Sequence, residues 1–335
     1  MLKRFRIDPR ALTGGFPAEG STREKMMFLL RLAVLAPSIH NTQPWKFSVD
    51  RGRIGIFADR TRWLAAADPD LRDLRMSLGC VLENLLVAAR HFGYMPEVTY
   101  APRATSPDFV ALVDLSRLAT GRGTRRDTSL QALKRRRTTY RASESRAVTP
   151  ALLESLAAAC HENGTVIYIT ADPTVIGAAA ELFRDANARQ LASPRYREEV
   201  AEWLRKGEYG LPRVLRALGR AGLPQLERAL EKEADLIASA PYFGVILSHG
   251  DDATAQMRAG QAFERIWLAA TTWKVGLRPT SAMCEVPLVK AKLARLVEAG
   301  DLRVLQAFRL GYGEPGGRRS PRRKVDESIV AVSLH

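Results

Sequence analysis

The polar loop Ala36-Pro-Ser-Ile-His-Asn-Thr-Gln-Pro-Trp45 is the segment of this sequence best suited to contact a ligand. It separates an apolar run with helical spacing from an alternating run typical of a strand, so its polar residues are not core residues of either element. Ser38 and His40 carry hydrogen-bonding groups, and the amide of Asn41 can both donate and accept. The residues alone leave open what this loop contacts.

A dense basic run, Lys134-Arg-Arg-Arg-Thr-Thr-Tyr-Arg141, offers a second kind of chemistry. The Arg136 guanidinium can grip two phosphate oxygens at once, and the Thr138 hydroxyl two residues later can add a third hydrogen bond. The run precedes a predicted helix, where anions are favoured. A solvated basic turn has the same composition, so the run by itself leaves both interpretations open.

Composition narrows the classes of partner. The chain has 335 residues, of which 46% are hydrophobic, enough for one large domain or two ordinary ones. Its net charge of +15 attracts anions, but Lys and Arg are spread along the chain. A nucleic-acid surface would interleave aromatic side chains with the basic ones, and aromatic residues make up only 7%. We therefore expect no nucleic-acid partner.

Cysteine usage and apolar runs indicate a cytoplasmic chain. Cys80, Cys160 and Cys284 fit no zinc or redox spacing, and their odd number argues against a disulfide framework. We expect no metal. The first residues have charges but lack the apolar stretch of a secretory signal. No apolar run approaches the ~20 residues of a membrane span, so no membrane contact is expected.

The elements that must position these two segments follow from the hydrophobic spacing. In the first half it predicts helices at 23–36 and 71–92, a hairpin of 45–49 with 54–57, and strands at 97–101 and 109–115. A polar, glycine-bearing stretch at 118–128 predicts a linker. In the second half we expect helices near 149–161, 172–206, 211–238, 256–274 and 287–298, with strands at 165–170, 242–248 and 303–311.

The chain is interpreted as two tandem, diverged copies of one α+β unit. The segment 79–89 aligns without a gap with 260–270, sharing the first Gly, a Glu and the final Ala-Ala. Two amphipathic helices could match this well by chance. The predicted units are an arm at 1–22, a first repeat at 23–128 and a second repeat at 129–335. Only the first has the polar loop and only the second the dense basic run, so each keeps half of a site.

Several further motifs give these segments a family context: Asp59-Arg-Thr-Arg-Trp63, Asn187-Ala-Arg-Gln190, Tyr196-Arg-Glu-Glu199, Arg309-Leu-Gly-Tyr-Gly313 and Ser320-Pro-Arg-Arg323. With the loop and the basic run, the sequence resembles the FMN-dependent nitroreductase superfamily, in particular its fused twin-repeat (Acg-like) branch, from about residue 25 to 330. The resemblance implies an α+β, nitroreductase-like fold in which the two repeats of one chain form a pseudo-dimer.

The resemblance also implies which residues hold FMN. The basic run and a late arginine would bind the phosphate, the polar loop would line the flavin, and a segment after the repeat helix would run beside the flavin N5 atom. In that order, the expected residues are Arg135, Arg136 and Thr138 with Arg322 or Arg323; Pro37, Ser38, His40 and Asn41; and Ser281, Ala282 and Met283. Family members often have Glu-Gly where this chain has Ala282-Met283, which is a departure.

Other side chains near these segments have more ordinary expected roles. His40 is either a base or a hydrogen-bonding wall, and we favour the wall. Gln43 is expected to satisfy loop backbone and Trp45 to lie in the core. The charged stretch 196–238, broken near residues 207, 210–212 and 222–224, is either a lid over the site or a pair of surface helices.

The implied activity is hydride transfer from NADPH or NADH, bound transiently, through FMN to an electron-poor small molecule. Because such chemistry resides in the flavin, the lack of a catalytic triad is expected. Two alternatives stay open: a flavin-dependent oxidase or dehydrogenase of a specific small molecule, and a non-catalytic FMN-sequestering protein. The split repeats imply one FMN per chain and a monomer that imitates a dimer.

Overall fold

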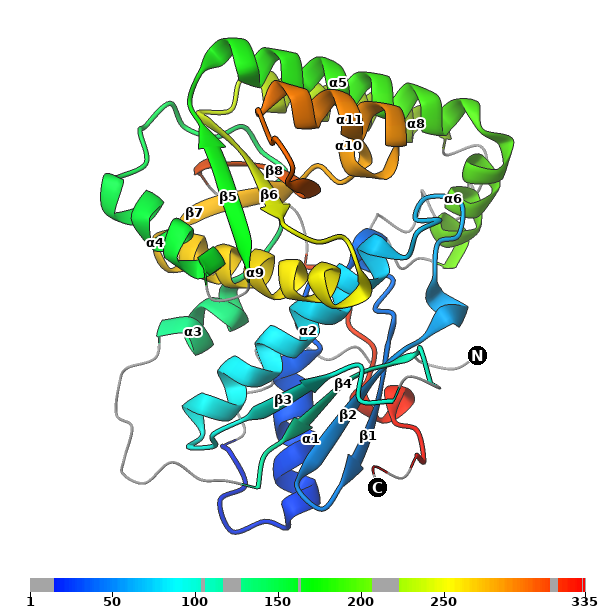
Figure 1. Cartoon of the computed structure of the whole chain (residues 1–335), viewed down its shortest axis with the longest axis vertical. Coiled ribbons are helices and arrows are strands. Elements are labelled where there is room, and N and C mark those ends of the chain that lie inside the picture. The colour runs from blue at the N-terminus through cyan, green and yellow to red at the C-terminus, as the bar shows by residue number, and fades with distance from the viewer. Residues whose placement is uncertain are drawn as a thin grey trace.

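The computed structural model of the chain describes residues 15–103, 106–116, 128–161, 164–206, 223–313, 319–332 and 334. Figure 1 shows a mixed α/β molecule with a β-sheet toward each end and two long helices, α2 and α9, crossing between the sheets. The predicted α+β class is therefore confirmed at this level. The predicted arm at 1–22 lies outside the described residues up to residue 14, as does nearly all of the predicted linker at 118–128.

The first half builds one sheet, its helices and two short 3-10 turns. In chain order its elements are α1 (Thr22–Ala33), η2 (Ile39–Asn41), β1 (Trp45–Asp50), β2 (Arg53–Ala58), η3 (Arg60–Arg62), α2 (Arg72–His91), β3 (Glu97–Tyr100) and β4 (Phe109–Asp114). These agree with the predicted helices, hairpin and strands of residues 23–115 to within a few residues.

The second half builds the other sheet with more helices around it. Its elements are α3 (Thr128–Arg135), α4 (Pro150–His161), β5 (Thr165–Thr170), α5 (Pro173–Ala192), α6 (Pro194–Lys206), α8 (Leu223–Ala238), β6 (Tyr242–Ser248), α9 (Ala253–Thr272), β7 (Val275–Pro279), α10 (Ala282–Glu285), α11 (Pro287–Leu296), β8 (Arg303–Tyr312) and η5 (Val325–Ser328). The sequence did not predict α3, β7 or α10.

The prediction of one helix over 172–206 is wrong, because the chain breaks between α5 and α6. Ser193 has ψ 119° and precedes Pro194, whose ring disfavours the helical conformation in the residue before it. Pro194 then starts α6, where a missing N–H costs nothing. The break lets α6 turn away from α5, as Figure 1 shows at the right of the molecule.

The two sheets have the same strand order. The first runs β1-β2-β4-β3 and the second β5-β6-β8-β7, and every pairing in both is antiparallel. Each sheet also has a register shift in its central pair, after Ile56 in β2 and after Ile246 in β6. The β1–β2 hairpin turns at Arg51 and Gly52. Their φ values of 45° and 83° are those of a type I′ turn.

The crossing of α2 and α9 requires two glycines. A Cβ atom added to Gly79 would lie 2.0 Å from the backbone oxygen of Met257, and one added to Gly260 would lie 2.1 Å from that of Met76. The two contacts are reciprocal. Gly79 of α2 faces Met257, three residues before Gly260, and Gly260 of α9 faces Met76, three residues before Gly79. Two helix backbones therefore pack directly against each other at the centre of the core.

The C-terminal segment crosses back onto the first sheet. Ile329 forms a parallel bridge with Phe47 of β1, and the Val330 N–H donates to the Phe47 carbonyl at 2.8 Å. Figure 1 shows this segment running beside β1. The residues assigned to the second repeat therefore also complete the first half of the molecule.

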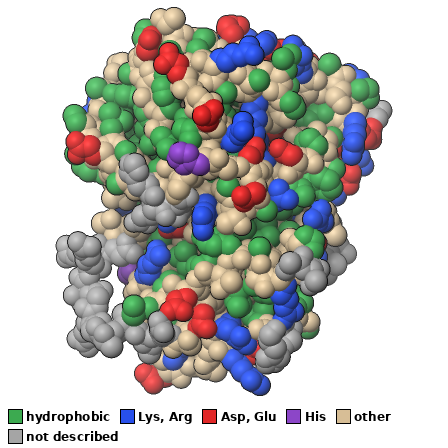
Figure 2. All heavy atoms as spheres, in the orientation of Figure 1, with side chains coloured by type: hydrophobic (Ala, Val, Ile, Leu, Met, Phe, Trp, Pro, Cys, Tyr) green, Lys and Arg blue, Asp and Glu red, His purple; other side chains and the backbone are tan. Residues whose placement is uncertain are grey.

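The surface in Figure 2 has no single sign of charge. On this face Lys and Arg side chains are interspersed with Asp and Glu, and hydrophobic side chains lie between them. The three cysteines are buried and free. Among the described residues, no helix has the length and apolar character needed to cross a bilayer, and no cluster of His, Cys, Asp and Glu could hold a metal ion.

Candidate functional site

One cavity gathers the polar loop, the basic run and the segment after β7. It encloses about 450 Å³, within the range of small-ligand sites. Nine of the twelve expected site residues line it: Pro37, Ser38, His40, Asn41, Arg136, Thr138, Ser281, Ala282 and Arg322. The basic run lies about 100 residues after the loop in the sequence, and the Ser281 segment about 240 residues after it. Both face the same cavity as the loop.

The polar loop is held in a conformation that few residues adopt. His40, Asn41 and Gln43 have φ values of 44°, 57° and 52°, in the left-handed region that disfavours non-glycine residues. Ser38 compensates part of this cost, because its Oγ accepts from the Gln43 N–H at 2.9 Å. Such backbone persists only when its surroundings determine it, and it concentrates at functional sites.

The C-terminal segment provides those surroundings. Asn41 donates its Nδ2 to the Pro321 carbonyl at 3.0 Å and accepts from Arg322 Nη1 at 2.9 Å. Gln43, only 2% exposed, accepts the Arg323 N–H at 2.8 Å and donates to the Asn41 carbonyl. Gln43 therefore satisfies loop backbone, as the sequence predicts, and Trp45 is fully buried in the core.

The guanidinium of buried Arg136 and that of the partly buried Arg322 meet at one carbonyl beside the cavity. Arg136 Nη2 donates to the Leu35 oxygen at 2.9 Å, and Arg322 Nη2 donates to the same oxygen at 3.1 Å. Arg136 also stacks on Trp267, 4.5 Å from the ring centroid. Burial, followed by repulsion from Arg136, lowers the pKa of Arg322 to about 9. The charges repel each other here and would be stabilised by an anion.

The carboxyl group nearest to this pair is Glu264 of α9. It is fully buried, with Oε1 3.3 Å from Arg136 Nε. Burial raises the pKa of Glu264 to about 8 despite the attraction of Arg136 and Arg322. A mostly protonated Glu264 does not neutralise the two guanidiniums, so positive charge is left at this end of the cavity.

Replacing Glu264 by Gln should flatten the pH dependence of stability. A carboxyl whose pKa is higher in the folded state stabilises the fold fully at low pH, and that contribution is lost as pH rises from about 4.5 through about 8. From about pH 6 to 8 the wild-type free energy of unfolding should fall relative to Glu264→Gln by up to about 1.4 kcal/mol per pH unit. Urea unfolding of both proteins measures this difference, and equal slopes would contradict it.

The floor of the cavity comes from the second sheet. Thr138 bridges to Leu277 of β7, which brings the basic run against the edge of that sheet. Ser281 follows β7 and accepts from Gln306 Nε2 at 2.9 Å. Thr280 is 1% exposed, and its Oγ1 has no hydrogen-bond partner among the described residues. This orphan hydroxyl on the cavity wall is suited to a ligand.

His40 is kept neutral in the cavity wall. Burial, reinforced by the positive charge of Arg278, lowers the pKa of His40 to about 4. At neutral pH it is then uncharged and a poor proton acceptor. This favours the hydrogen-bonding wall over the base, as expected from the sequence.

Three of the expected residues lie outside the cavity lining. Arg135 is exposed at the end of α3, and Met283 of α10 is fully buried in the hydrophobic core. Arg323 turns toward the loop, where Nη1 donates to the Gln43 carbonyl at 3.2 Å and lies 3.6 Å from Asp59. Of the two late arginines, Arg322 is the one at the cavity.

Sequence reasoning did not assign the opposite wall. It comprises side chains from α2, α5, α6, α8, α9 and α10: Asp73, Met76, Ser77, Cys80, Phe183, Asn187, Gln190, Tyr196, Leu226, Leu230, Phe263, Trp267 and Glu285. One signal was available in α5, where Phe183, Asn187 and Gln190 follow helical spacing on one face. Both parts of the predicted lid stretch contribute, through α6 and α8, and residues 207–222 lie outside the described residues.

Curated relatives were found for most of the chain, although no family model matches it. A protein of Mycobacterium tuberculosis H37Rv, provisionally named NAD(P)H nitroreductase Rv3131, is 28% identical over 292 residues, covering 83% of this chain and 81% of that protein. A second protein of the same strain, provisionally named NAD(P)H nitroreductase acg, is 32% identical over 95 residues, or 28% of this chain and 29% of that protein.

Two solved structures are similar over part of the chain. The FMN-dependent nitroreductase NfnB from Mycobacterium smegmatis, in complex with NADPH, is 14% identical and covers 62% of this chain and 98% of its own, with a TM-score of 0.46. A nitroreductase from Bacteroides fragilis with bound FMN is 18% identical. The match covers 61% of this chain and 98% of that protein, with a TM-score of 0.38.

Proposed function

We propose that this chain, which belongs to the nitroreductase superfamily, is an FMN-dependent oxidoreductase that takes a hydride from NADPH or NADH and passes it to an electron-poor small molecule. The observation that carries the proposal is the pair Arg136 and Arg322. The two guanidiniums share one carbonyl and have Glu264 as their acidic neighbour, so an anion such as the FMN phosphate would stabilise the pair.

The rest of the cavity fits the other parts of FMN. The strained loop offers Pro37 as an apolar surface and Ser38 and Asn41 as polar groups, which a flavin ring and a ribityl chain both require. The unpartnered Thr280 hydroxyl and the Ser281 segment add hydrogen-bonding groups on the opposite side. Thr138 lies next to the guanidiniums in sequence and lines the same space.

Each residue then has a role that needs no side-chain nucleophile. FMN, when bound, supplies the hydride chemistry itself. Arg136, Arg322 and Thr138 hold its phosphate, and the loop 37–41 orients its ring. Leu226 and Leu230 of α8 cover the cavity with apolar surface and limit the entry of water.

We also propose that the two halves of the chain stand in for the two subunits of a dimer. The identical strand orders, the register shifts after Ile56 and Ile246 and the reciprocal contacts of Gly79 and Gly260 support two diverged repeats. Since the loop comes from one half and the basic run from the other, a single FMN per chain and a monomer follow.

Adding NADPH or NADH anaerobically to the flavin-loaded chain tests the activity. The flavin absorbance should bleach without any other substrate and return when a quinone or a nitroaromatic compound is added. A bound flavin that neither nicotinamide bleaches would contradict the reductase and favour the oxidase or the FMN-sequestering alternative. Of those, only an oxidase would bleach with a donor of its own.

A further inference from the structure

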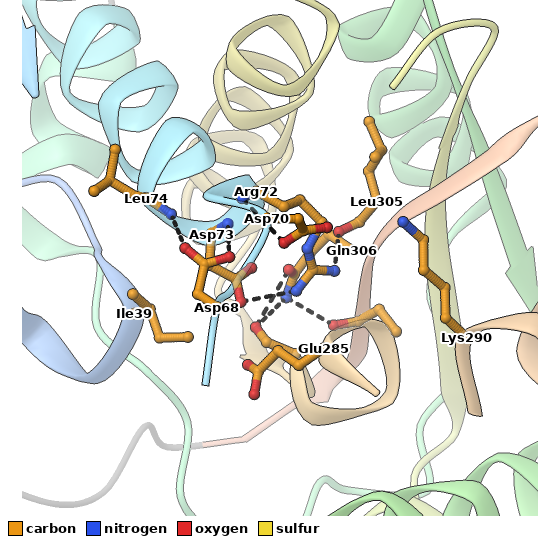
Figure 3. Close-up of polar contacts among 12 residues, drawn as sticks. Ile39, Asp68, Asp70, Arg72, Asp73, Leu74, Glu285, Lys290, Leu305 and Gln306 are labelled. Atoms are coloured by element: carbon orange, nitrogen blue, oxygen red, sulfur yellow. Dashed lines mark hydrogen bonds and ion pairs between the residues drawn. The ribbon is translucent and has the colours of Figure 1, made fainter. Parts of the chain in front are cut away.

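Two arginine networks meet strand β8 beside the cavity. Figure 3 shows the first, in which Arg72 of α2 donates Nη2 to Asp73 Oδ2 at 2.7 Å and Nη1 to the Leu305 carbonyl of β8 at 2.8 Å. This network joins α2 to β8. The second is centred on Arg309, which lies further along β8 and opens the motif Arg309-Leu-Gly-Tyr-Gly313. The proposed FMN site leaves that motif without a role.

Glu233 of α8 contacts two arginines that face each other across the second sheet. Arg278 of β7 is the cross-strand partner of Arg309, and like charges placed directly opposite destabilise a sheet. Glu233 Oε1 accepts from Arg309 Nε at 2.7 Å, and Glu233 Oε2 lies 3.4 Å from Arg278 Nε. Arg309 is 1% exposed and Glu233 5%. One buried carboxylate therefore offsets two facing guanidiniums and ties its helix to the sheet.

The same Arg309 guanidinium holds the last residues of the basic run. Its Nη2 donates to the Thr139 carbonyl and its Nη1 to the Arg141 carbonyl, each at 3.2 Å. A guanidinium can bind both carbonyls and Glu233 at once, because its N–H donors form a rigid planar fork. A lysine ammonium is a compact point charge and does not span these acceptors. Arg309 thus connects α8 to the basic run.

The segment that Arg309 holds includes a proposed phosphate ligand. Thr138 forms a parallel bridge with Leu277 of β7, and the Thr139 N–H donates to the Leu277 carbonyl at 3.1 Å. The backbone of Thr139 is therefore bonded to β7 through its N–H and to Arg309 through its carbonyl. Thr138 and Arg136 line the cavity just before this anchored residue. Their position toward a phosphate depends on the anchor.

We propose that Arg309 and Glu233 are positioning residues for the FMN phosphate. Arg309 fixes the basic run so that Thr138 and Arg136 face the phosphate, and Glu233 holds the Arg309 guanidinium in that orientation. This deepens the proposed function and rests on it. Because Glu233 also fastens α8, which lines the cavity, the cover of the cavity and the grip on the phosphate are coupled. Release of α8 from the sheet removes a partner of Arg309 and loosens the phosphate site.

Comparing FMN with riboflavin isolates the contribution of the phosphate. Riboflavin has the same ring and ribityl chain, so a variant that displaces only the phosphate ligands weakens FMN binding and leaves riboflavin binding as it was. Arg309→Lys should bind FMN about tenfold more weakly than the wild type, the usual value of one hydrogen bond, and riboflavin with the wild-type affinity. Fluorescence titration of the flavin-free chain measures both dissociation constants.

Arg303→Lys is the matched control. Arg303 begins the same strand but is exposed, so both of its flavin affinities should equal those of the wild type. Equal FMN affinities for the wild type, Arg309→Lys and Arg303→Lys would overturn the role of Arg309. A loss in Arg309→Lys that FMN and riboflavin share equally would also overturn it, because the whole cavity would then have loosened.

The phosphorus NMR signal of bound FMN is a second readout, one that a purely structural role would not change. At saturating FMN, the signal in Arg309→Lys should be displaced from its wild-type position, because the chemical shift reports the hydrogen bonds and ionisation of the phosphate. The signal in Arg303→Lys should coincide with that of the wild type. An undisplaced signal in Arg309→Lys would contradict the proposed positioning.

Glu233→Gln tests the coupling between α8 and the phosphate. The ratio of FMN affinity to riboflavin affinity should fall about tenfold, because Arg309 loses its charged partner. Glu231→Gln is the control on the same helix, since Glu231 is exposed and pairs with Arg184, and its ratio should be that of the wild type. Adding Arg278→Gln to Glu233→Gln relieves the facing charges if the single variant does not fold. An unchanged ratio would mean that Glu233 only fastens α8.

These binding measurements are separate from electron transfer. A wild type that binds FMN but is not bleached by NADPH would remove the reductase, and the comparison of FMN with riboflavin would still decide the positioning. A wild type that is bleached, with the wild-type affinity ratio kept in Arg309→Lys and Glu233→Gln, would leave the reductase standing and remove both positioning residues. A wild type that takes up no FMN would overturn the proposed function itself.

Discussion

Replacing Arg136 by Gln should weaken FMN binding about 100-fold or more. The variant removes a buried, charge-assisted partner of the phosphate, and loss of such a group costs about 2–5 kcal/mol. Fold stability should change less, because Glu264, with a pKa of about 8, is mostly protonated at neutral pH and is not left as an unpaired charge. Fluorescence titration of the flavin-free chain with FMN measures the dissociation constant.

Arg135→Gln is the matched control for this experiment. The substitution removes one positive charge, as Arg136→Gln does, at the neighbouring residue. Because Arg135 is exposed and does not line the cavity, the FMN affinity of this variant should be nearly that of the wild type. The double variant Arg136→Gln, Glu264→Gln removes both side chains of this contact, so the same loss of affinity there would not be due to a Glu264 left without its partner. Equal losses in the Arg135 and Arg136 variants would mean that only overall charge attracts FMN.

Gly79→Ala and Gly260→Ala should each destabilise the fold by about 3 kcal/mol, at the upper end for overpacked cores. Inside a helix, Ala is normally more stabilising than Gly by about 1 kcal/mol. Helix propensity alone would therefore predict that both substitutions stabilise the fold. We expect the opposite because the backbone oxygen of Met257 or Met76 lies 2.0 or 2.1 Å from the added Cβ. Neither carbonyl can move without separating α2 from α9.

Gly177→Ala provides the control for these two variants. Gly177 also lies inside a helix, α5, and a Cβ atom there meets nothing within 4 Å. Its replacement should stabilise the chain by about 0.5–1 kcal/mol. Urea unfolding of all three variants measures the effects, and a stabilising Gly79→Ala would contradict the close crossing of the two helices.

Hydrophobic spacing predicted most of the elements. The structure adds how they begin and end: the capping box of Ser21 and Glu24 begins α1, the Arg51-Gly52 turn closes the first hairpin, and Asp252 caps α9. The break at Ser193-Pro194 was also visible in the sequence, but the long helical pattern on both sides concealed it. Strand β7, Val275–Pro279, was missed because five residues ending in proline give little alternation.

The candidate site was predictable only where its residues form loops. The loop around Asn41 and the run around Arg136 interrupt regular patterns, so their types and spacing stand out. Asp73, Glu264 and Glu285 lie in helices, where a charged residue ordinarily faces solvent, and no local pattern shows that tertiary packing has buried them. The raised pKa values of Glu264 and Glu285 result from which helices cross, and a single sequence does not contain that information locally.

Counting FMN per chain tests the central claim, that one complete flavin site is shared between the two halves. The purified chain is saturated with FMN, freed of unbound flavin and denatured, and the released FMN is measured by absorbance against protein concentration. The account predicts one FMN per chain, with its uptake greatly reduced in Arg136→Gln. Two FMN molecules per chain, or none after saturation, would contradict it.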